Sequence, residues 1–309
     1  MSDCGLPDLA RTLCRQQAQI FFSVPSFTVA TAELALEPLV NLSRLLIRSG
    51  DGDGDGAYHL LNTLYKAVAS RSDTVIDGMK IGFGDLIRDD DHREIVRWMW
   101  TVLLADGTRA LTSAGRWPDA LAHLRQHNGV GRRMLDGRQV AVVASITAGD
   151  ADGALALLAD TVLGEPWENA VTACLTVLCR RSAHQSVEAD LAVMVERYRQ
   201  IAPASGLAVF GTRLGLSVID AAGSVEYPGV RGIAAALIQR ACQDGYAARE
   251  VLAHEGCAAL LNDEQARVLA EVLDACALGR RILPPRLAAD LSTALDTSET
   301  VLSGTLRVR

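Results

Sequence analysis

Two stretches of the chain follow one pattern: AGRWPDALAHL at residues 114–124 and AGDADGALALL at residues 148–158. In each stretch, alanine and leucine stand five and six residues after the glycine, and a second leucine follows three residues later. The two glycines, Gly115 and Gly149, are 34 residues apart, which is the period of a repeated helix–turn–helix unit. The pattern therefore predicts a fold built from repeated helical hairpins.

The residue types in this pattern suit a helical hairpin. Each glycine follows a helical stretch and can end it, because glycine adopts positive φ without strain. Ala120 and Ala154 are small, as is required where the second helix of a hairpin crosses close to the first. Leucines spaced three residues apart then give that second helix an apolar stripe.

The same residues resemble the tetratricopeptide repeat, in which a turn glycine is followed five residues later by alanine. Trp117 stands where that family often has a large aromatic residue, and Pro166 where it has the proline that closes a repeat. Leu104 and Arg138 depart from the family, because both stand in place of its usual tryptophan. The resemblance covers residues 101–166, and it implies a TPR-like α-solenoid of such hairpins.

Helical periodicity extends over most of the remaining chain. The expected fold class is therefore all-α, a helical-hairpin array with no significant sheet. Pro38 is placed in the first turn of a helix at residues 37–49, where proline is tolerated. Asn262 and Gln265 are expected to form a capping box at the start of another helix.

The chain divides into four predicted parts. They are an N-terminal helical arm at 1–30, a hairpin with an acidic turn at 31–88, the TPR-like repeats at 89–202, and C-terminal helical repeats at 203–309. Glycines interrupt the helical period over residues 72–88, where a loose helix or an irregular connection is expected. The tail from Ser298 is polar and is expected to be frayed.

Composition sets the broad class of the protein. The 309 residues are 49% hydrophobic and carry a net charge of −7; there is no basic run, so nucleic acid is not an expected partner. No apolar run reaches the roughly 18 residues of a membrane span, and acidic residues precede the first basic one, unlike a secretion signal. A cytoplasmic protein without membrane contact is expected. Arginine supplies 28 of the 30 basic residues, a composition typical of GC-rich bacteria such as actinobacteria.

An acidic turn at Asp51, Asp53 and Asp55 matches the first half of a calcium-binding EF-hand loop, where alternate carboxylates precede a glycine. The position of that loop's bidentate glutamate holds Asn62, which offers one neutral oxygen. A flexible acidic turn between two helices explains the same residues without a metal.

A second acidic group, Asp90, Asp91 and Glu94, fits the DDxxE motif with which terpene synthases hold magnesium over a diphosphate. The second metal motif of that family is missing, and carboxylates at a helix N-terminus explain the same residues as a cap. His123 and His127 lie four residues apart without a third ligand, so surface or packing roles are expected for them. The sequence assigns no catalytic residue and no cofactor.

The implied solenoid has a concave surface built from the first helix of each hairpin, where such proteins bind peptides or partner helices. The groove positions implied by the resemblance are Arg109, Thr112, Asp136, Gln139, Arg180 and Arg181. Arginine pairs with carboxylates bidentately, so this groove would suit an acidic peptide or helix. Solvated helix faces explain the same polar residues without a partner.

The expected function is a non-catalytic binding or scaffold protein that captures a peptide or a partner protein. Two settings are considered: an accessory subunit in actinobacterial, lanthipeptide-type peptide biosynthesis, or a regulator. The alternative is an all-α, magnesium-dependent enzyme similar to the terpene synthases.

Overall fold

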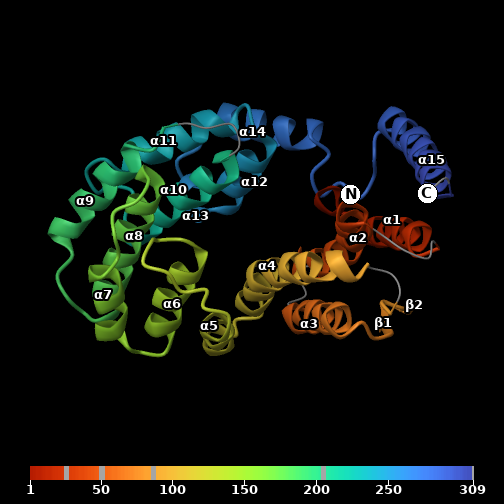
Figure 1. The fold of residues 1–309 in the computed structure, drawn as a ribbon. Helices are drawn as coiled ribbons and strands as arrows, with labels where there is room; N and C mark the ends of the chain where they lie inside the picture. The colour runs from red at the N-terminus through yellow and green to blue at the C-terminus, as the bar shows by residue number, and fades with distance from the viewer. Residues whose placement is uncertain (24–27, 49–52, 85–87, 203–206, 308–309) are drawn as a thin grey trace. The chain divides into compact units, whose positions relative to one another are not determined.

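A computed structural model describes residues 1–23, 28–48, 53–84, 88–202 and 207–307, and this part of the chain is mostly helical (Figure 1). The all-α fold class is confirmed. The chain forms two compact units, Met1–His127 with Gly279–Arg309 (unit 1) and Asn128–Leu278 (unit 2). Their limits differ from the boundaries predicted at residues 30, 88 and 202, and residues 203–206 lie outside the described part.

Unit 1 is built mainly from long helices, and a short 3-10 helix (Ser2–Cys4) precedes them. Its elements are α1 (Pro7–Phe21), α2 (Val29–Arg48), α3 (Gly54–Ser70), β1 (Thr74–Ile76), β2 (Met79–Ile81), α4 (Asp89–Ser113), α5 (Trp117–Gln126) and α15 (Pro285–Arg307). Helices α2, α3 and α4 pack against one another and enclose a hydrophobic core that includes Leu36, Leu39, Leu61, Leu64, Ile95 and Met99. This core gives unit 1 an interior of its own.

The C-terminal segment joins unit 1 through backbone hydrogen bonds to the N-terminus. The N–H of Gly279 donates to the carbonyl of Asp3 at 2.9 Å, and the N–H of Arg281 donates to the carbonyl of Cys4 at 2.8 Å. Helix α15 also lies against α1. The tail predicted to be frayed from Ser298 is instead part of α15, which continues to Arg307.

Residues 72–88 contain a β-hairpin, which corrects the loose helix or irregular connection expected there. Strands β1 and β2 are antiparallel, with Val75 opposite Lys80. Asp77 and Gly78 form the two-residue turn between them, and both have positive φ, 50° and 78°. An Asp-Gly pair suits this turn because both of its central residues need positive φ. The side chains of Arg11 and Arg15 pair with Asp77 and attach the turn to α1.

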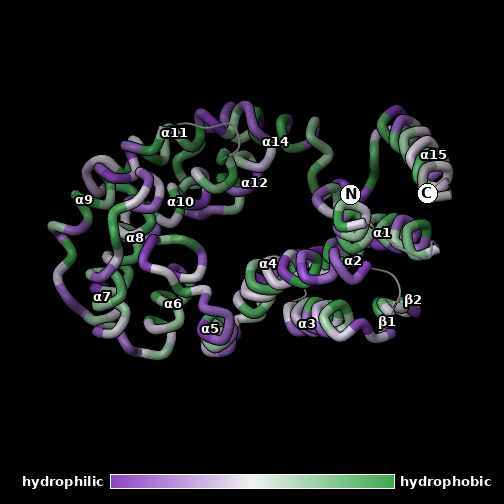
Figure 2. Tube along the Cα trace, viewed as in Figure 1, coloured by the Kyte–Doolittle hydropathy of each residue, from purple (hydrophilic) through white to green (hydrophobic). Residues whose placement is uncertain are grey.

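Unit 2 is a series of consecutive helical hairpins. Its helices are α6 (Asp136–Thr147), α7 (Ala151–Ala159), α8 (Pro166–Ser182), α9 (Glu188–Arg199), α10 (Ala208–Ala222), α11 (Val230–Ala241), α12 (Gly245–Ala253), α13 (Glu255–Ala258) and α14 (Asp263–Ala275). Each of α6, α8, α10 and α12 pairs with the second helix of its own hairpin, and these four helices also lie against one another in order. Along the tubes of unit 2, hydrophobic residues recur among hydrophilic ones, as amphipathic helices require (Figure 2).

Both hairpins predicted from the repeated pattern form as expected. Gly115 and Gly149 have φ of 71° and 78°, and each is the left-handed residue that ends the first helix. In the first hairpin the N–H of Arg116 donates to the carbonyl of Leu111 at 2.9 Å, and the second hairpin has the corresponding bond. This is the Schellman arrangement that satisfies the last carbonyls of a helix. The first hairpin, α4–α5, belongs to unit 1, and the second, α6–α7, belongs to unit 2.

Local sequence signals were correct at some helix ends and wrong at others. The capping box of Asn262 and Gln265 is confirmed at the start of α14. Pro38 lies inside α2 and not in a first turn, because that helix begins at Val29. Proline has no N–H to donate to the carbonyl of Leu34, one turn earlier. Leu34 is itself exposed.

None of the helices in the described ranges combines the length and the apolar character that a membrane crossing needs.

Candidate functional site

Two of the predicted groove residues lie on α4 in unit 1. The exposed guanidinium of Arg109 donates to Asp106 Oδ1 at 3.2 Å. Asp106 is buried and also accepts from Arg44 Nε at 2.9 Å. The hydroxyl of Thr112 donates to the carbonyl of Arg109, one turn earlier, at 3.0 Å. Arg109 therefore has a carboxylate partner on its own helix.

The other four predicted groove residues lie on α6 and α8 in unit 2. Asp136 is exposed in the first turn of α6, and Gln139 Nε2 donates to the carbonyl of Met134 at 3.1 Å. Because these four belong to unit 2 and the residues on α4 to unit 1, one continuous row of groove residues stays a prediction.

The two arginines at the end of α8 both contact neighbouring helices. Arg180 Nε is buried 3.1 Å from Asp190 Oδ2 on α9, an ion-pair contact without hydrogen-bond geometry. Arg181 is exposed, and its Nη2 donates to the carbonyl of Ala222 at 2.7 Å, at the C-terminus of α10. Ala222 lies in the last turn of α10, where the backbone carbonyls have no N–H partner within the helix. Arg181 therefore caps a neighbouring helix while part of its guanidinium remains accessible.

Two carboxylates of the acidic turn, Asp53 and Asp55, interact with other groups of the protein. Asp53 caps α3, because its side chain accepts from the N–H of Gly56 at 2.9 Å. Asp55 Oδ1 lies 2.5 Å from Arg116 Nη1, at the turn between α4 and α5. A Cβ added at Gly54 would overlap the carbonyl oxygen of Ala110, so this glycine allows α3 to approach α4 closely. The third calcium candidate, Asp51, lies outside the described residues.

The DDxxE carboxylates lie at the start of α4. Asp90 and Asp91 are in its first turn, and Glu94 is exposed one turn later. Carboxylates at this position stabilise the positive end of the helix dipole. Across the described ranges, no three or more His, Cys, Asp and Glu side chains are grouped as a metal site would require.

His123 and His127 belong to a partly buried hydrogen-bonded cluster in unit 1. The Tyr58 hydroxyl lies 3.2 Å from His123 Nδ1, and His123 Nε2 lies 3.1 Å from the carbonyl of Leu103. A carbonyl only accepts, so His123 carries its proton on Nε2 and accepts from Tyr58. Trp100 Nε1 donates to His127 Nδ1 at 3.0 Å, and the two imidazole rings lie 4.7 Å apart. Burial lowers the pKa of both histidines, and His127 lowers that of His123 further.

Arg138 is a buried residue whose role the sequence did not indicate. Its side chain is only 4% exposed. Its guanidinium donates to the carbonyls of Gly131 and Leu157, at 2.7 and 2.6 Å, and to the hydroxyl of Thr161 at 2.8 Å. It also lies 3.3 Å from Asp160 Oδ2. Arg138 therefore holds the end of α7 and the loop before α6 together. The only signal was that it replaces the tryptophan of the repeat family.

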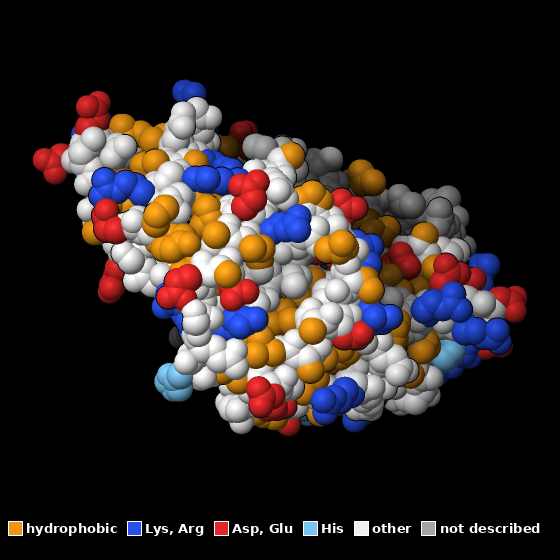
Figure 3. Space-filling view, turned by 90° about the vertical axis from the view of Figure 1, so that its left-hand side faces the viewer, with side chains coloured by type: hydrophobic (Ala, Val, Ile, Leu, Met, Phe, Trp, Pro, Cys, Tyr) orange, Lys and Arg blue, Asp and Glu red, His pale blue; other side chains and the backbone are white. Residues whose placement is uncertain are grey.

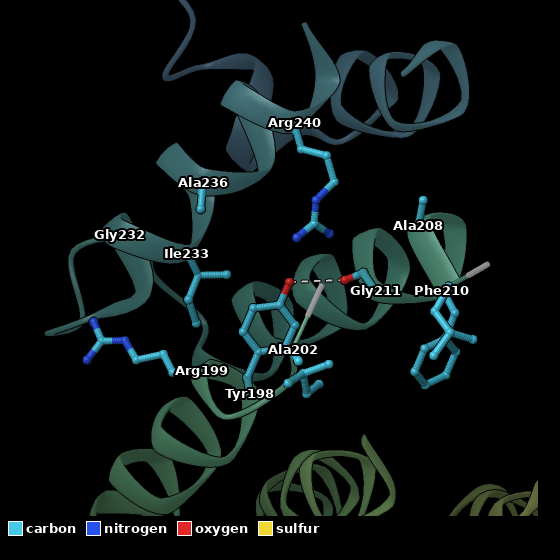
Figure 4. A pocket seen from close by; sticks show the side chains of 12 residues that line it. Tyr198, Arg199, Ala202, Ala208, Phe210, Gly211, Gly232, Ile233, Ala236 and Arg240 are labelled. Carbon is cyan, nitrogen blue, oxygen red and sulfur yellow. Dashed lines mark hydrogen bonds between the residues drawn. The ribbon is translucent and has the colours of Figure 1, made fainter. Parts of the chain in front are cut away.

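A cavity in unit 2 was also missed. It has a volume of about 520 Å³ and lies among α9, α10 and α11 (Figure 4). Its lining is Tyr198, Arg199, Ile201, Ala202, Leu207, Ala208, Phe210, Gly211, Gly232, Ile233, Ala236 and Arg240. No sequence motif indicates it, because it forms where small residues from separate helices face one another.

Elsewhere on unit 2 the surface is mixed. Over the face that carries α7 and α9, basic, acidic and hydrophobic side chains are interspersed (Figure 3). Binding to this face by net charge alone is therefore not favoured, and recognition would depend on particular residues.

Comparison of the chain with protein-family models, with curated proteins and with solved structures finds no match.

Proposed function

We propose that this chain is a non-catalytic binding protein whose helical hairpins capture a peptide or a partner protein. The supporting observation is the packing order in unit 2, where α8 lies against both α6 and α10, and α10 lies against α12. These are the first helices of successive hairpins, and helical-repeat proteins build their binding surface from that layer of helices.

The proposed contact residues on this layer are Asp136, Gln139, Arg180 and Arg181, with Arg109 and Thr112 on α4. A guanidinium has five N–H donors, and the hydrogen bond from Arg181 to Ala222 uses one nitrogen. Arg181 could therefore bind a carboxylate of the partner while it still caps α10. Acidic peptides or acidic helices are the partner class that this chemistry favours.

Two narrower settings belong to the same proposal. The protein would act as an accessory subunit that presents a precursor peptide to modifying enzymes, or it would act as a regulator. The identity of the neighbouring genes would distinguish these two settings, because the role of a repeat protein depends on its partner.

The test is partner capture by the full chain carrying Arg109→Gln and Arg180→Gln. Loss of two ion pairs that are at least partly exposed should change the free energy of unfolding by about 0–1 kcal/mol each. Partner capture should fall, and residual capture should weaken further as salt is raised. The matched control is Arg231→Gln with Arg267→Gln, which removes two exposed, ion-paired arginines from the second helices α11 and α14.

Two results would count against the proposal. If the double variant retains every partner of the wild type, the arginines do not form the binding surface. If the wild type releases diphosphate from a prenyl diphosphate only with magnesium, and Asp90→Asn abolishes that release, the protein is the alternative enzyme.

A further inference from the structure

The cavity among α9, α10 and α11 has mostly apolar walls. Its volume of about 520 Å³ falls within the roughly 300–1,000 Å³ of small-molecule sites. The walls are contributed mainly by Ile201, Ala202, Leu207, Ala208, Phe210, Ile233 and Ala236. Phe210 is held in place by an edge-to-face contact with Trp167, with ring centroids 5.5 Å apart. An apolar body of small-molecule size would find hydrophobic contacts on these walls.

The polar end of the cavity is organised around Tyr198. Its hydroxyl donates to the carbonyl of Gly211 at 3.0 Å, and the guanidinium of Arg240 points toward the same hydroxyl (Figure 4). A Cβ added at Gly215 would overlap this hydroxyl, so the tyrosine can take its position only beside a glycine. The proton of Tyr198 is therefore already donated to the backbone, and its hydroxyl faces Arg240.

Arg240 is the group left to bind a ligand. Its guanidinium extends from α11 toward Tyr198 and Gly211 (Figure 4). It has five N–H donors in a fixed plane, which can bind the two oxygens of a carboxylate. Gly211 leaves room for this guanidinium, because a Cβ there would lie only 3.3 Å from Arg240 Nη1.

The charge around the cavity is positive. Arg199 and Arg240 are among its lining residues, and none of the twelve carries a carboxylate. In the described part of the chain, neither guanidinium lies within ion-pair distance of an Asp or Glu. This contrasts with the net charge of −7 of the chain. An anion would therefore be attracted, and a cation repelled.

We propose that this cavity binds an apolar monocarboxylate, with the carboxylate on Arg240 and the apolar body against Phe210 and Ile233. A planar carboxylate matches the guanidinium fork. A sugar phosphate or nucleotide would bring several hydroxyls to walls that offer them few partners. The carboxylate could belong to a free acid or to the C-terminus of a peptide that ends in an apolar residue. This inference does not depend on the proposed groove, because the two share no residue.

The experiment is calorimetric titration of the full chain with octanoate, 1-octanol and octylamine. Octanoate should bind, 1-octanol should bind more weakly, and octylamine should not bind. Arg240→Gln should weaken octanoate binding by about tenfold or more, since hydrogen bonds to charged groups contribute about 1.5–3 kcal/mol, and should leave 1-octanol unchanged. Arg240→Lys should recover part of the affinity, because it restores the charge without the fork.

A second variant tests the apolar walls. Ala236 is exposed to the cavity, so Ala236→Trp should fill the space without displacing the core and should abolish binding of octanoate and 1-octanol alike. The control Arg231→Gln, an exposed site on the same helix, should bind octanoate as the wild type does. Melting curves establish that each variant is folded.

Two peptides distinguish the sources of the carboxylate. A short peptide ending in leucine is compared as the free acid and as the C-terminal amide. Binding of the peptide acid without octanoate assigns the site to a peptide C-terminus, and binding of octanoate without the peptide acid assigns it to a free acid. The proposal is overturned if neither carboxylate binds, if octylamine binds as well as octanoate, or if Arg240→Gln leaves carboxylate binding unchanged.

Discussion

The imidazoles of His123, which is buried, and His127, which is partly buried, make stability depend on pH. Burial lowers the pKa of both, and the neighbouring His127 adds to the effect on His123. In the unfolded chain a histidine titrates near 6.5. The unfolded chain therefore takes up protons first as the pH falls. The stabilisation is complete above about pH 6.5 and is lost as the pH drops toward the folded pKa values.

We accordingly expect the free energy of unfolding to decrease as the pH falls from about 6.5 into the acid range. Urea unfolding across this range measures it, with His123→Gln combined with His127→Gln as the variant that should flatten the dependence. The carboxylates of Asp77, Glu168 and Glu250 also have lowered pKa values. Their contribution is lost at lower pH, below about 4.5, so the two ranges can be separated. An equally steep decrease in the double variant would exclude the histidines as its cause.

The second prediction concerns the contribution of the buried Arg138 side chain to stability. Arg138→Met should destabilise the protein by roughly 1–3 kcal/mol, because it leaves the carbonyls of Gly131 and Leu157 without their charged donor. Arg138→Lys should restore little, since an ammonium cannot reproduce the planar set of donors.

The matched control is Arg132→Met. Arg132 bonds to the same Asp160 at 2.8 Å, but its side chain is 67% exposed, so this change should cost about 0–1 kcal/mol. Denaturant unfolding of the three variants provides the measurement. Equal losses for Arg138→Met and Arg132→Met would show that the buried network contributes no more than a surface pair.

The hairpin pattern predicts where extra volume cannot be accommodated. Ala120 and Ala154 are both 0% exposed, so Ala→Leu at either position should cost about 1–3 kcal/mol through overpacking. Ala122 and Ala156 lie two residues further along the same helices and are exposed, so Ala→Leu there should be nearly neutral. Thermal unfolding compares the four variants. Similar midpoints for the buried and exposed pairs would contradict the packing described for these helices.

Helices were predictable from sequence because their signals are local. The apolar period of α8, the capping box of α14 and the turn glycines Gly115 and Gly149 each depend on a few neighbouring residues. The β-hairpin was missed although its signal is also local. The Asp77-Gly78 pair between two short alternating strands indicates it, but Gly78, Gly82 and Gly84 also interrupt a helical period, which favours an irregular connection.

The candidate sites were less predictable, because they depend on contacts between distant segments. The cavity requires Tyr198, Gly211 and Arg240, from three helices, to meet at one place. The role of Asp55 depends on Arg116, which is 61 residues away. The C-terminal segment belongs to unit 1 because Gly279 forms a backbone hydrogen bond with Asp3. No periodicity in the sequence encodes any of these contacts.

The two units have separate hydrophobic cores, which leads to the last prediction. Leu64 is 0% exposed in the core of unit 1, and Leu237 is 1% exposed in the core of unit 2. Leu→Ala at either position should destabilise by about 2–5 kcal/mol, from lost burial and a residual cavity. Because each core is enclosed within its own unit, the loss should be local.

Hydrogen–deuterium exchange shows, segment by segment, whether the loss of stability is confined to one unit. Leu64→Ala should accelerate amide exchange across α2, α3 and α4 and leave α8, α10 and α11 as protected as in the wild type. Leu237→Ala should do the reverse, so each variant serves as the control for the other. Faster exchange throughout both units in either variant would mean that the two cores unfold as one cooperative structure, and the division at His127 would then have no energetic counterpart.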